Sequence, residues 1–150
     1  MTAPIEILLV EDDANDVELM QRALEKQRLT NRIHVVRDGA EAIDYFFGDG
    51  NGGGDRQLIP HVIFLDLKLP KVDGLEVLRR LKAEERTRAI PVVVLTSSNE
   101  ESDLVQSYHL GANSYVVKPV GFKEFSQVVE DLGLYWLLHN RPPVPGPADG

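Results

Sequence analysis

The chain has 150 residues, of which 43% are hydrophobic, so we expect one domain with a substantial core. Its net charge of -8, from 16 basic and 24 acidic residues, argues against direct binding to a nucleic acid. The absence of cysteine excludes disulfides and thiolate metal sites, and no apolar run is long enough to span a membrane, so we expect a cytoplasmic protein without a membrane partner.

Apolar runs typical of buried strands alternate with helical periods along the chain. The expected strands are 5–10, 33–36, 62–65, 92–95 and 114–117. The expected helices are 17–24 behind a candidate N-cap at Asn15, then 40–47, 75–81, 101–110 and 122–136. Five strands alternating with five helices predict an open parallel sheet with helices on both faces, which is a doubly wound α/β fold.

Two segments lie outside this alternation. The glycine-rich segment 48–55 is interpreted as a flexible surface loop, with a phosphate-binding loop as the alternative. The alternative is disfavoured because the segment lacks the lysine and the serine or threonine of a P-loop and carries aspartates. Residues 141–150 form a proline- and glycine-rich tail that we expect to be disordered. The predicted organisation is one domain over residues 1–140 followed by this tail, with no effector domain attached.

Polar side chains directly follow the predicted strands. They are Glu11, Asp12 and Asp13 after the first strand, Asp66 after the third, Thr96 at the end of the fourth and Lys118 after the fifth. Because the carboxyl ends of parallel strands meet at one edge of a sheet, we expect these side chains to converge. Several carboxylates beside one lysine indicate a site for Mg²⁺ and a phosphoryl group.

The acidic residues have both functional and structural interpretations. Glu11 and Asp12 would repel each other unless a cation lay between them, and Mg²⁺ prefers such ligands. The alternative for this pair is an acidic helix N-terminus favoured by the helix dipole, and Asp13 more plausibly begins the helix than binds metal. Asp66 beside such a cation can act as a nucleophile toward a phosphoryl group, giving an acyl phosphate. Otherwise Asp66 would be an aspartate that forms a turn.

Thr96 and Lys118 also have structural alternatives. Thr96 ends a run of β-branched residues, where threonine is common for packing alone. Lys118 stands between Val117 and Pro119, whose extended backbone directs it to the shared edge, where it would neutralise charge on a transferring phosphoryl oxygen. The alternative is a solvated lysine. A cis bond at Pro119 would turn the chain sharply into the last helix, and the sequence permits one.

With these residues in place, the chain resembles the receiver domains of two-component response regulators over residues 5–138. The resemblance implies a flavodoxin-like (βα)5 sheet with strand order 2-1-3-4-5. It implies that Glu11, Asp12 and the backbone carbonyl of Lys68 hold Mg²⁺ together with Asp66. It also implies that Asp66 accepts a phosphoryl group from the histidine of a sensor kinase.

The same resemblance assigns a switch to this chain. Thr96 matches the switch hydroxyl, Tyr115 the aromatic residue that rotates, and Lys118 the lysine that binds the phosphoryl group. Tyr115 could equally be passive packing. The implied activity is that of a phosphoacceptor, which assists its own phosphorylation and dephosphorylation and signals through changed protein contacts.

The last helix carries more apolar residues than one core stripe needs. The surplus consists of Leu134, Tyr135, Leu137 and Leu138. Such a surplus predicts a homodimer through this region, with packing against the chain's own C-terminal tail as the alternative. Together with the glycine-rich segment, this end of the chain resembles the stand-alone regulators that serve bacterial phytochrome kinases. The resemblance therefore implies a bacteriophytochrome as the sensor kinase.

Three other function classes remain to be weighed. A haloacid-dehalogenase-type phosphatase also forms an aspartyl phosphate, but it needs a second aspartate two residues further on as a general acid, where this chain has Lys68. A flavin or dinucleotide binder of similar fold would need glycines where Glu11, Asp12 and Asp13 stand. A receiver-like binding module that works without phosphorylation is the last alternative, and the complete set of site residues counts against it.

Overall fold

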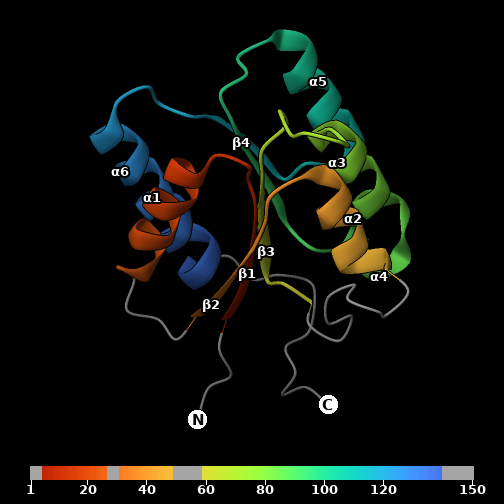
Figure 1. Cartoon of the computed structure of the whole chain (residues 1–150), viewed down its shortest axis with the longest axis horizontal. Coiled ribbons are helices and arrows are strands. Elements are labelled where there is room, and N and C mark those ends of the chain that lie inside the picture. Colours follow the sequence, from red (N-terminus) through yellow and green to blue (C-terminus); the bar gives the residue numbers. More distant parts are fainter. Residues whose placement is uncertain (1–4, 27–30, 49–58, 140–150) are drawn as a thin grey trace.

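The computed structural model describes residues 5–26, 31–48 and 59–139 (Figure 1). Its strands are β1 (Ile5–Val10), β2 (Asn31–Val36), β3 (Val62–Leu65), β4 (Val92–Thr96) and β5 (Ser114–Val117). They form one sheet in the order β2-β1-β3-β4-β5, and every neighbouring pair is parallel. The predicted flavodoxin-like fold is confirmed. The predicted tail, and all of the predicted glycine-rich loop except Gly48, lie outside the described residues.

Helices cover both faces of the sheet. They are α1 (Ala14–Glu25), α2 (Gly39–Phe47), α3 (Gly74–Ala83), α4 (Glu85–Arg88), α5 (Glu101–Leu110), α6 (Phe122–Gly133) and the π-helix η1 (Leu134–His139). Figure 1 shows α1 and α6 on one face and the remaining α-helices on the other. The short α4 and the π-helical continuation of α6 are additions to the five helices predicted. Within the described ranges, no helix has the length and apolar character that crossing a membrane requires.

The central strands are buried on both faces. Leu8 and Ile63 point into the core layer under α2 and α3, whereas Ile7, Leu9 and Phe64 point into the layer under α1 and α6. Each of these side chains is almost completely removed from solvent. Because successive residues of a strand alternate between faces, two apolar layers hold β1 and β3 in place. The residues that follow these strands therefore start from a rigid edge.

The start of α1 differs from the sequence expectation. Its N-cap is Asp13 and not Asn15, because Oδ1 of Asp13 accepts hydrogen bonds from the backbone amides of Asn15 and Asp16 at 2.9 and 3.1 Å. An aspartate in this position satisfies amides that have no partner within the helix. This agrees with the expectation that Asp13 begins the helix.

The burial of Leu137 corrects one part of the prediction for the last helix, in which Leu137 belonged to an exposed apolar surplus. Leu137 is only 9% exposed and belongs to the core, whereas Leu138 is 50% exposed. The buried residues of this helix, Phe125, Val129, Gly133 and Leu137, follow one another at steps of four. The wider turn of the π-helix keeps Leu137 on the core side, where the ordinary helical period turns the side chain outward. The exposed apolar surface of η1 therefore consists of Leu134, Tyr135 and Leu138.

Candidate functional site

The carboxyl ends of the strands bring Lys118 together with two carboxylates. Its Nζ lies 2.6 Å from Oε1 of Glu11, which follows β1, and 3.2 Å from Oδ2 of Asp66, which follows β3. All three side chains are buried, with 9% of the Lys118 side chain exposed. An ammonium group in this position is charge-paired and not solvated, which excludes the solvated lysine considered from the sequence.

The backbone around Asp66 fixes its carboxylate. The amide of Asp66 donates to the carbonyl of Val10 at 3.0 Å, and the amide of Lys68 donates to Oδ1 of Asp66 at 3.1 Å. The amide of Gly74 returns to the carbonyl of Leu67 at 2.9 Å. A Cβ atom at position 74 would lie 2.3 Å from the Asp66 carbonyl oxygen, so only glycine permits this close approach. The tight loop after β3 thus orients Asp66.

Three carboxylates at this edge can share one cation. Glu11, Asp12 and Asp66 each offer an oxygen, and these oxygens lie within 4.8 Å of one another. Oxygen ligands of like charge at this spacing suit a hard divalent cation, and a partly exposed set suits Mg²⁺, which keeps several waters. The residues present therefore fit a divalent metal. The additional ligand expected from the backbone carbonyl of Lys68 remains a prediction.

Burial and neighbouring charges shift the pKa values of both Glu11 and Lys118. Burial raises the pKa of Glu11 from 4.5 to about 7, although the hydrogen bond from Lys118 opposes this rise and the charge of Asp66 adds to it. Burial lowers the pKa of Lys118, but its hydrogen bonds to Asp16 and Glu11 outweigh burial, so the pKa is raised and the ammonium stays charged. Glu11 can therefore take up a proton near neutral pH, while the ammonium of Lys118 remains charged.

Asp16 belongs to this site and was missed in the sequence. Its Oδ2 accepts a hydrogen bond from Nζ of Lys118 at 2.8 Å. Asp16 stands in the first turn of α1, three residues after the N-cap Asp13, so the sequence pattern indicates only an acidic residue near a helix N-terminus. Because Asp16 and Lys118 are 102 positions apart, no local sequence pattern reveals the contact between them.

Thr96 and Tyr115 are both bonded to Ser98. The fully buried Thr96 accepts a hydrogen bond from the amide of Ser98 at 3.3 Å through Oγ1. The half-buried Tyr115 donates its hydroxyl to the carbonyl of Ser98 at 2.9 Å. Displacement of the Thr96 hydroxyl would therefore be transmitted to the backbone residue that holds Tyr115.

The side chain of Lys68 is directed toward α5. Its Nζ lies 3.4 Å from Oδ2 of Asp103, and Ser98 donates its hydroxyl to the same oxygen at 2.5 Å. The pKa of Lys68 is raised by its own hydrogen bond to Asp103 and by the charge of that carboxylate. The loop that carries Asp66 and the β4–α5 loop are thus joined through Asp103.

The bond before Pro119 corrects the sequence expectation, because it is trans. The amide of Lys118 donates to the carbonyl of Thr96 at 2.7 Å, which extends the pairing of β4 and β5. The chain bends at residues 120 and 121 before α6 begins. Since that bend supplies the turn, the bond keeps the trans form, which is intrinsically favoured by about 0.5–1 kcal/mol.

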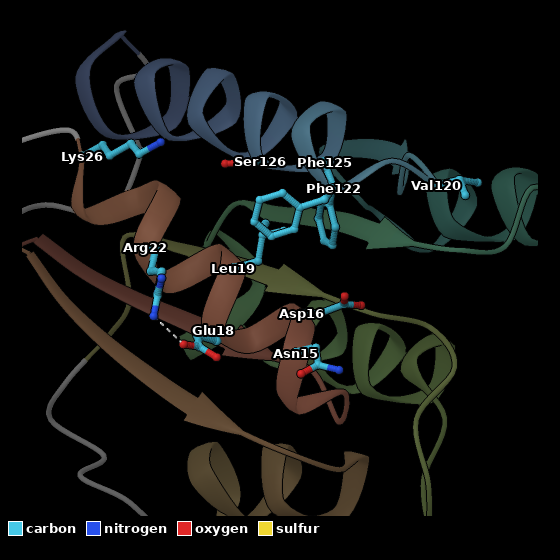
Figure 2. A pocket seen from close by; sticks show the side chains of 10 residues that line it. All are labelled: Asn15, Asp16, Glu18, Leu19, Arg22, Lys26, Val120, Phe122, Phe125 and Ser126. Atoms are coloured by element: carbon cyan, nitrogen blue, oxygen red, sulfur yellow. Dashed lines mark hydrogen bonds and ion pairs between the residues drawn. The ribbon is translucent and has the colours of Figure 1, made fainter.

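A groove of about 670 Å³ between α1 and α6 adjoins the carboxylates. It is lined by Asn15, Asp16, Glu18, Leu19, Arg22, Lys26, Val120, Phe122, Phe125 and Ser126. Figure 2 shows Leu19, Phe122 and Phe125 gathered between the two helices, with charged side chains of α1 along one edge. Phe122 is 74% exposed, and Val120 is fully exposed. Asp16 lines the groove and also contacts Lys118, so the groove and the buried site share this side chain.

The chain is similar in sequence to known signalling proteins over almost its full length. The model of the response regulator receiver domain family matches residues 7–130. The probable methanogenesis regulatory protein FilR2 of Methanothrix harundinacea is 46% identical, and the match covers 95% of this chain and 90% of FilR2. Response regulator Rcp1 of Synechocystis is 37% identical, with 89% of this chain and 90% of Rcp1 covered.

Solved structures of such proteins share the fold. The phosphorylated cyanobacterial phytochrome response regulator RcpA has a TM-score of 0.88 at 38% identity, covering 95% of this chain and all of RcpA. The Mn²⁺-bound form of Rcp1 has a TM-score of 0.88 at 37% identity, covering 94% of this chain and all of Rcp1. The bacteriophytochrome response regulator RtBRR has a TM-score of 0.71 at 53% identity, covering 98% of this chain and 88% of RtBRR.

The raised pKa of Glu11 predicts metal binding that depends on pH. Below about pH 7 this carboxyl holds a proton, which a divalent cation must displace. Isothermal titration calorimetry should show the affinity for Mg²⁺ falling by up to about tenfold for each pH unit below about 7. The Glu11→Gln variant should bind Mg²⁺ more weakly and lose this component of the pH dependence. An Mg²⁺ affinity of the native protein that is the same on both sides of neutrality would contradict the assignment.

Proposed function

The chain belongs to the response regulator receiver domain family, and on this basis we propose that Asp66 accepts a phosphoryl group from the phosphohistidine of a sensor histidine kinase. The family consists of signalling phosphoacceptors and not of enzymes that turn over a substrate. The observation that carries the proposal is the buried ammonium group of Lys118, 3.2 Å from the Asp66 carboxylate. In-line phosphoryl transfer requires a nucleophile and a positive charge held close together in fixed positions, and Asp66 and Lys118 are placed in this way.

The transfer exchanges one bond to phosphorus for another. An oxygen of Asp66 attacks the phosphorus atom, the bond to the histidine nitrogen breaks, and the imidazole leaves with that electron pair. Lys118 neutralises charge that develops on the phosphoryl oxygens. Mg²⁺, held by Glu11, Asp12 and Asp66 with the predicted carbonyl of Lys68, supplies further neutralisation when it is bound. The product is an acyl phosphate on Asp66.

The new phosphoryl group alters contacts at the edge of the sheet. The hydroxyl of Thr96 donates to a phosphoryl oxygen and moves toward it, which loosens its hydrogen bond from Ser98. The space that Thr96 vacates then allows Tyr115, whose hydroxyl is bonded to Ser98, to turn further inward. The surface formed by α5, β5 and α6 changes as a result, and the output is a change in protein contacts. The shared bonding to Ser98 supports this coupling.

Intact mass spectrometry after incubation with acetyl phosphate tests the acceptor. We expect the native protein to gain the mass of one phosphoryl group in the presence of Mg²⁺ and none when the metal is removed. Asp66→Asn should gain nothing, whereas the control Asp131→Asn, which changes an exposed carboxylate of α6, should behave as the native protein does. A native protein that stays unmodified would instead favour a binding module that works without phosphorylation.

The sensor kinase that we propose as donor is a bacteriophytochrome. Similarity to RcpA and RtBRR, which are both described as phytochrome response regulators, supports this partner. The net charge of -8 supports signalling through protein partners and not through direct contact with nucleic acid. The transfer would take place in the cytoplasm.

The groove between α1 and α6 is the proposed docking surface for this kinase. A phosphohistidine on another protein must reach Asp66, and the groove lies beside the site because Asp16, which lines it, contacts Lys118. Its exposed Phe122 and Val120 offer apolar anchors, and the charged side chains of α1 form a rim. Apolar anchors surrounded by polar residues are the usual composition of a specific protein interface.

The Phe122→Ala variant tests docking of the kinase separately from the phosphoryl-transfer reaction at Asp66. Phe122→Ala should slow transfer from a phosphorylated bacteriophytochrome kinase by at least about tenfold, because aromatic anchors contribute most to such interfaces. Modification by acetyl phosphate, which needs no docking, should be affected much less. Arg79→Ala, which removes an exposed side chain from α3, is the matched control for kinase transfer. Equal slowing with both donors would argue against the groove as a docking surface.

We also propose that the chain forms a homodimer through η1. Three apolar side chains there, Leu134, Tyr135 and Leu138, are 41%, 50% and 50% exposed. Tyr135 packs edge-on against Trp136 with ring centroids 5.1 Å apart, so the patch is continuous with the core. An exposed apolar patch of this kind supports self-association, and packing against the chain's own tail is the alternative.

Sedimentation velocity distinguishes these alternatives. The native protein should sediment as a dimer, and Leu138→Glu should shift it to a monomer because a carboxylate would be buried without a partner. Val105→Glu, which introduces the same charge at an exposed position of α5, should leave the dimer intact. If Val105→Glu dissociates the dimer and Leu138→Glu does not, the interface lies on α5. If the native protein is a monomer, packing of η1 against the chain's own tail is favoured instead.

A further inference from the structure

We propose that Asp16 is a positioning residue of the phosphoryl-acceptor site, which anchors the ammonium group of Lys118 while Glu11 and Asp66 serve the cation and the phosphoryl group. The inference rests on the proposed function and assigns a task to a residue outside the metal cluster. Asp16 acts through Lys118 and is not itself expected to touch the phosphoryl group.

The hydrogen bonds of Lys118 show why an anchor is needed. A lysine ammonium has three N–H donors, and here they face Glu11 at 2.6 Å, Asp16 at 2.8 Å and Asp66 at 3.2 Å. The ring of Phe125 lies 5.9 Å from the same nitrogen and covers it on another side. The donors are therefore fully used before any phosphoryl oxygen arrives. Lys118 can bind such an oxygen only by releasing one of its carboxylates.

The carboxylates of Glu11, Asp16 and Asp66 differ in the other groups that they are expected to bind. Glu11 and Asp66 belong to the cluster whose oxygens lie within 4.8 Å of one another, and an oxygen that ligates a cation has fewer lone pairs for Lys118. Asp66 also loses its charge when it becomes an acyl phosphate. Asp16 lies outside this cluster within the described part of the chain. It is the carboxylate that remains available to Lys118 at every stage.

The fold holds Asp16 in a suitable place for this task. It stands in the first turn of α1, where its own amide donates to Oδ1 of Asp13 at 3.1 Å. Its carboxylate contacts Lys118 at 2.8 Å, and Asp16 also lines the groove, whereas Glu11, Asp12 and Asp66 do not. A kinase docked in the groove would shield the Asp16–Lys118 pair from water, and a lower local dielectric strengthens such a pair. Docking and phosphoryl transfer would then favour the same position of Lys118.

The competing explanation is that Asp16 only stabilises α1. A carboxylate in a first turn interacts favourably with the helix dipole, whatever it contacts. That role would change the stability of the protein on substitution but leave the hydrogen bonds of Lys118 unaltered. The two explanations therefore differ in an observable of Lys118 itself.

The test is a ¹H–¹⁵N spectrum of the lysine ammonium groups of the full chain, with and without Mg²⁺. The signal of Lys118 is assigned by its loss in Lys118→Arg. We expect a protected Lys118 signal in the native protein under both conditions. In Asp16→Asn the signal should persist without metal, because Glu11 and Asp66 still hold the ammonium, and should disappear when Mg²⁺ is added.

The same samples are then modified with acetyl phosphate. Asp16→Asn should react roughly tenfold more slowly than the native protein, the size expected from weakening one hydrogen bond between charged groups. Asp16→Glu should restore both the signal and much of the rate, since a longer carboxylate can still reach Lys118. Glu25→Gln, which neutralises an exposed carboxylate in the last turn of the same helix, should match the native protein.

A Lys118 signal that survives Mg²⁺ in Asp16→Asn at the native reaction rate would overturn the proposal, even if the variant is less stable. The absence of a protected Lys118 signal from the metal-free native protein would overturn it as well. Failure of the proposed function is a separate result, because it would leave the native Asp66 unmodified. The ammonium spectra with Mg²⁺ require no phosphorylation and so test Asp16 in either case.

Discussion

The arrangement of side chains at the carboxyl edge of the sheet depends on one buried ammonium group that is surrounded by carboxylates. Lys118 faces Glu11, Asp16 and Asp66, which come from β1, α1 and β3, so one side chain ties together four elements of the fold. Each of these charges would be costly to bury alone, and removal of one partner leaves the others uncompensated. The two apolar layers around β1 and β3 supply the rigid edge that makes the arrangement possible.

The balance of charge in the site explains its chemistry. Negative charge exceeds positive charge there, and burial, with a smaller contribution from the charge of Asp66, raises the pKa of Glu11 to about 7. Such a site is strained electrostatically until a divalent cation arrives, and its attraction for cations follows directly from that strain.

The sequence was sufficient for the fold and for the convergence of Glu11, Asp66 and Lys118 at one edge of the sheet. Buried apolar runs predicted the parallel sheet, and Asp66 and Lys118 were found because strand ends of such a sheet meet. Asp16 could not be found in this way, since it lies in the first turn of α1 and does not follow a strand. Leu137 was assigned to the surface because a sequence pattern assumes the α-helical period, and the π-helical turn that changes this period has no recognised signature.

The links between the site and the rest of the chain were likewise beyond sequence reasoning. The end of the fourth predicted strand places Thr96 at the sheet edge, and the resemblance adds Tyr115, whereas their common partner Ser98 emerges only from the fold.

Crystallography with Mg²⁺ and beryllofluoride, which mimics an acyl phosphate, is the most direct test of Asp66 as the acceptor. The mimic should sit on the Asp66 carboxylate, with Lys118 bridging it and Asp16. A mimic bound elsewhere, or a Lys118 side chain turned away from it, would contradict this assignment.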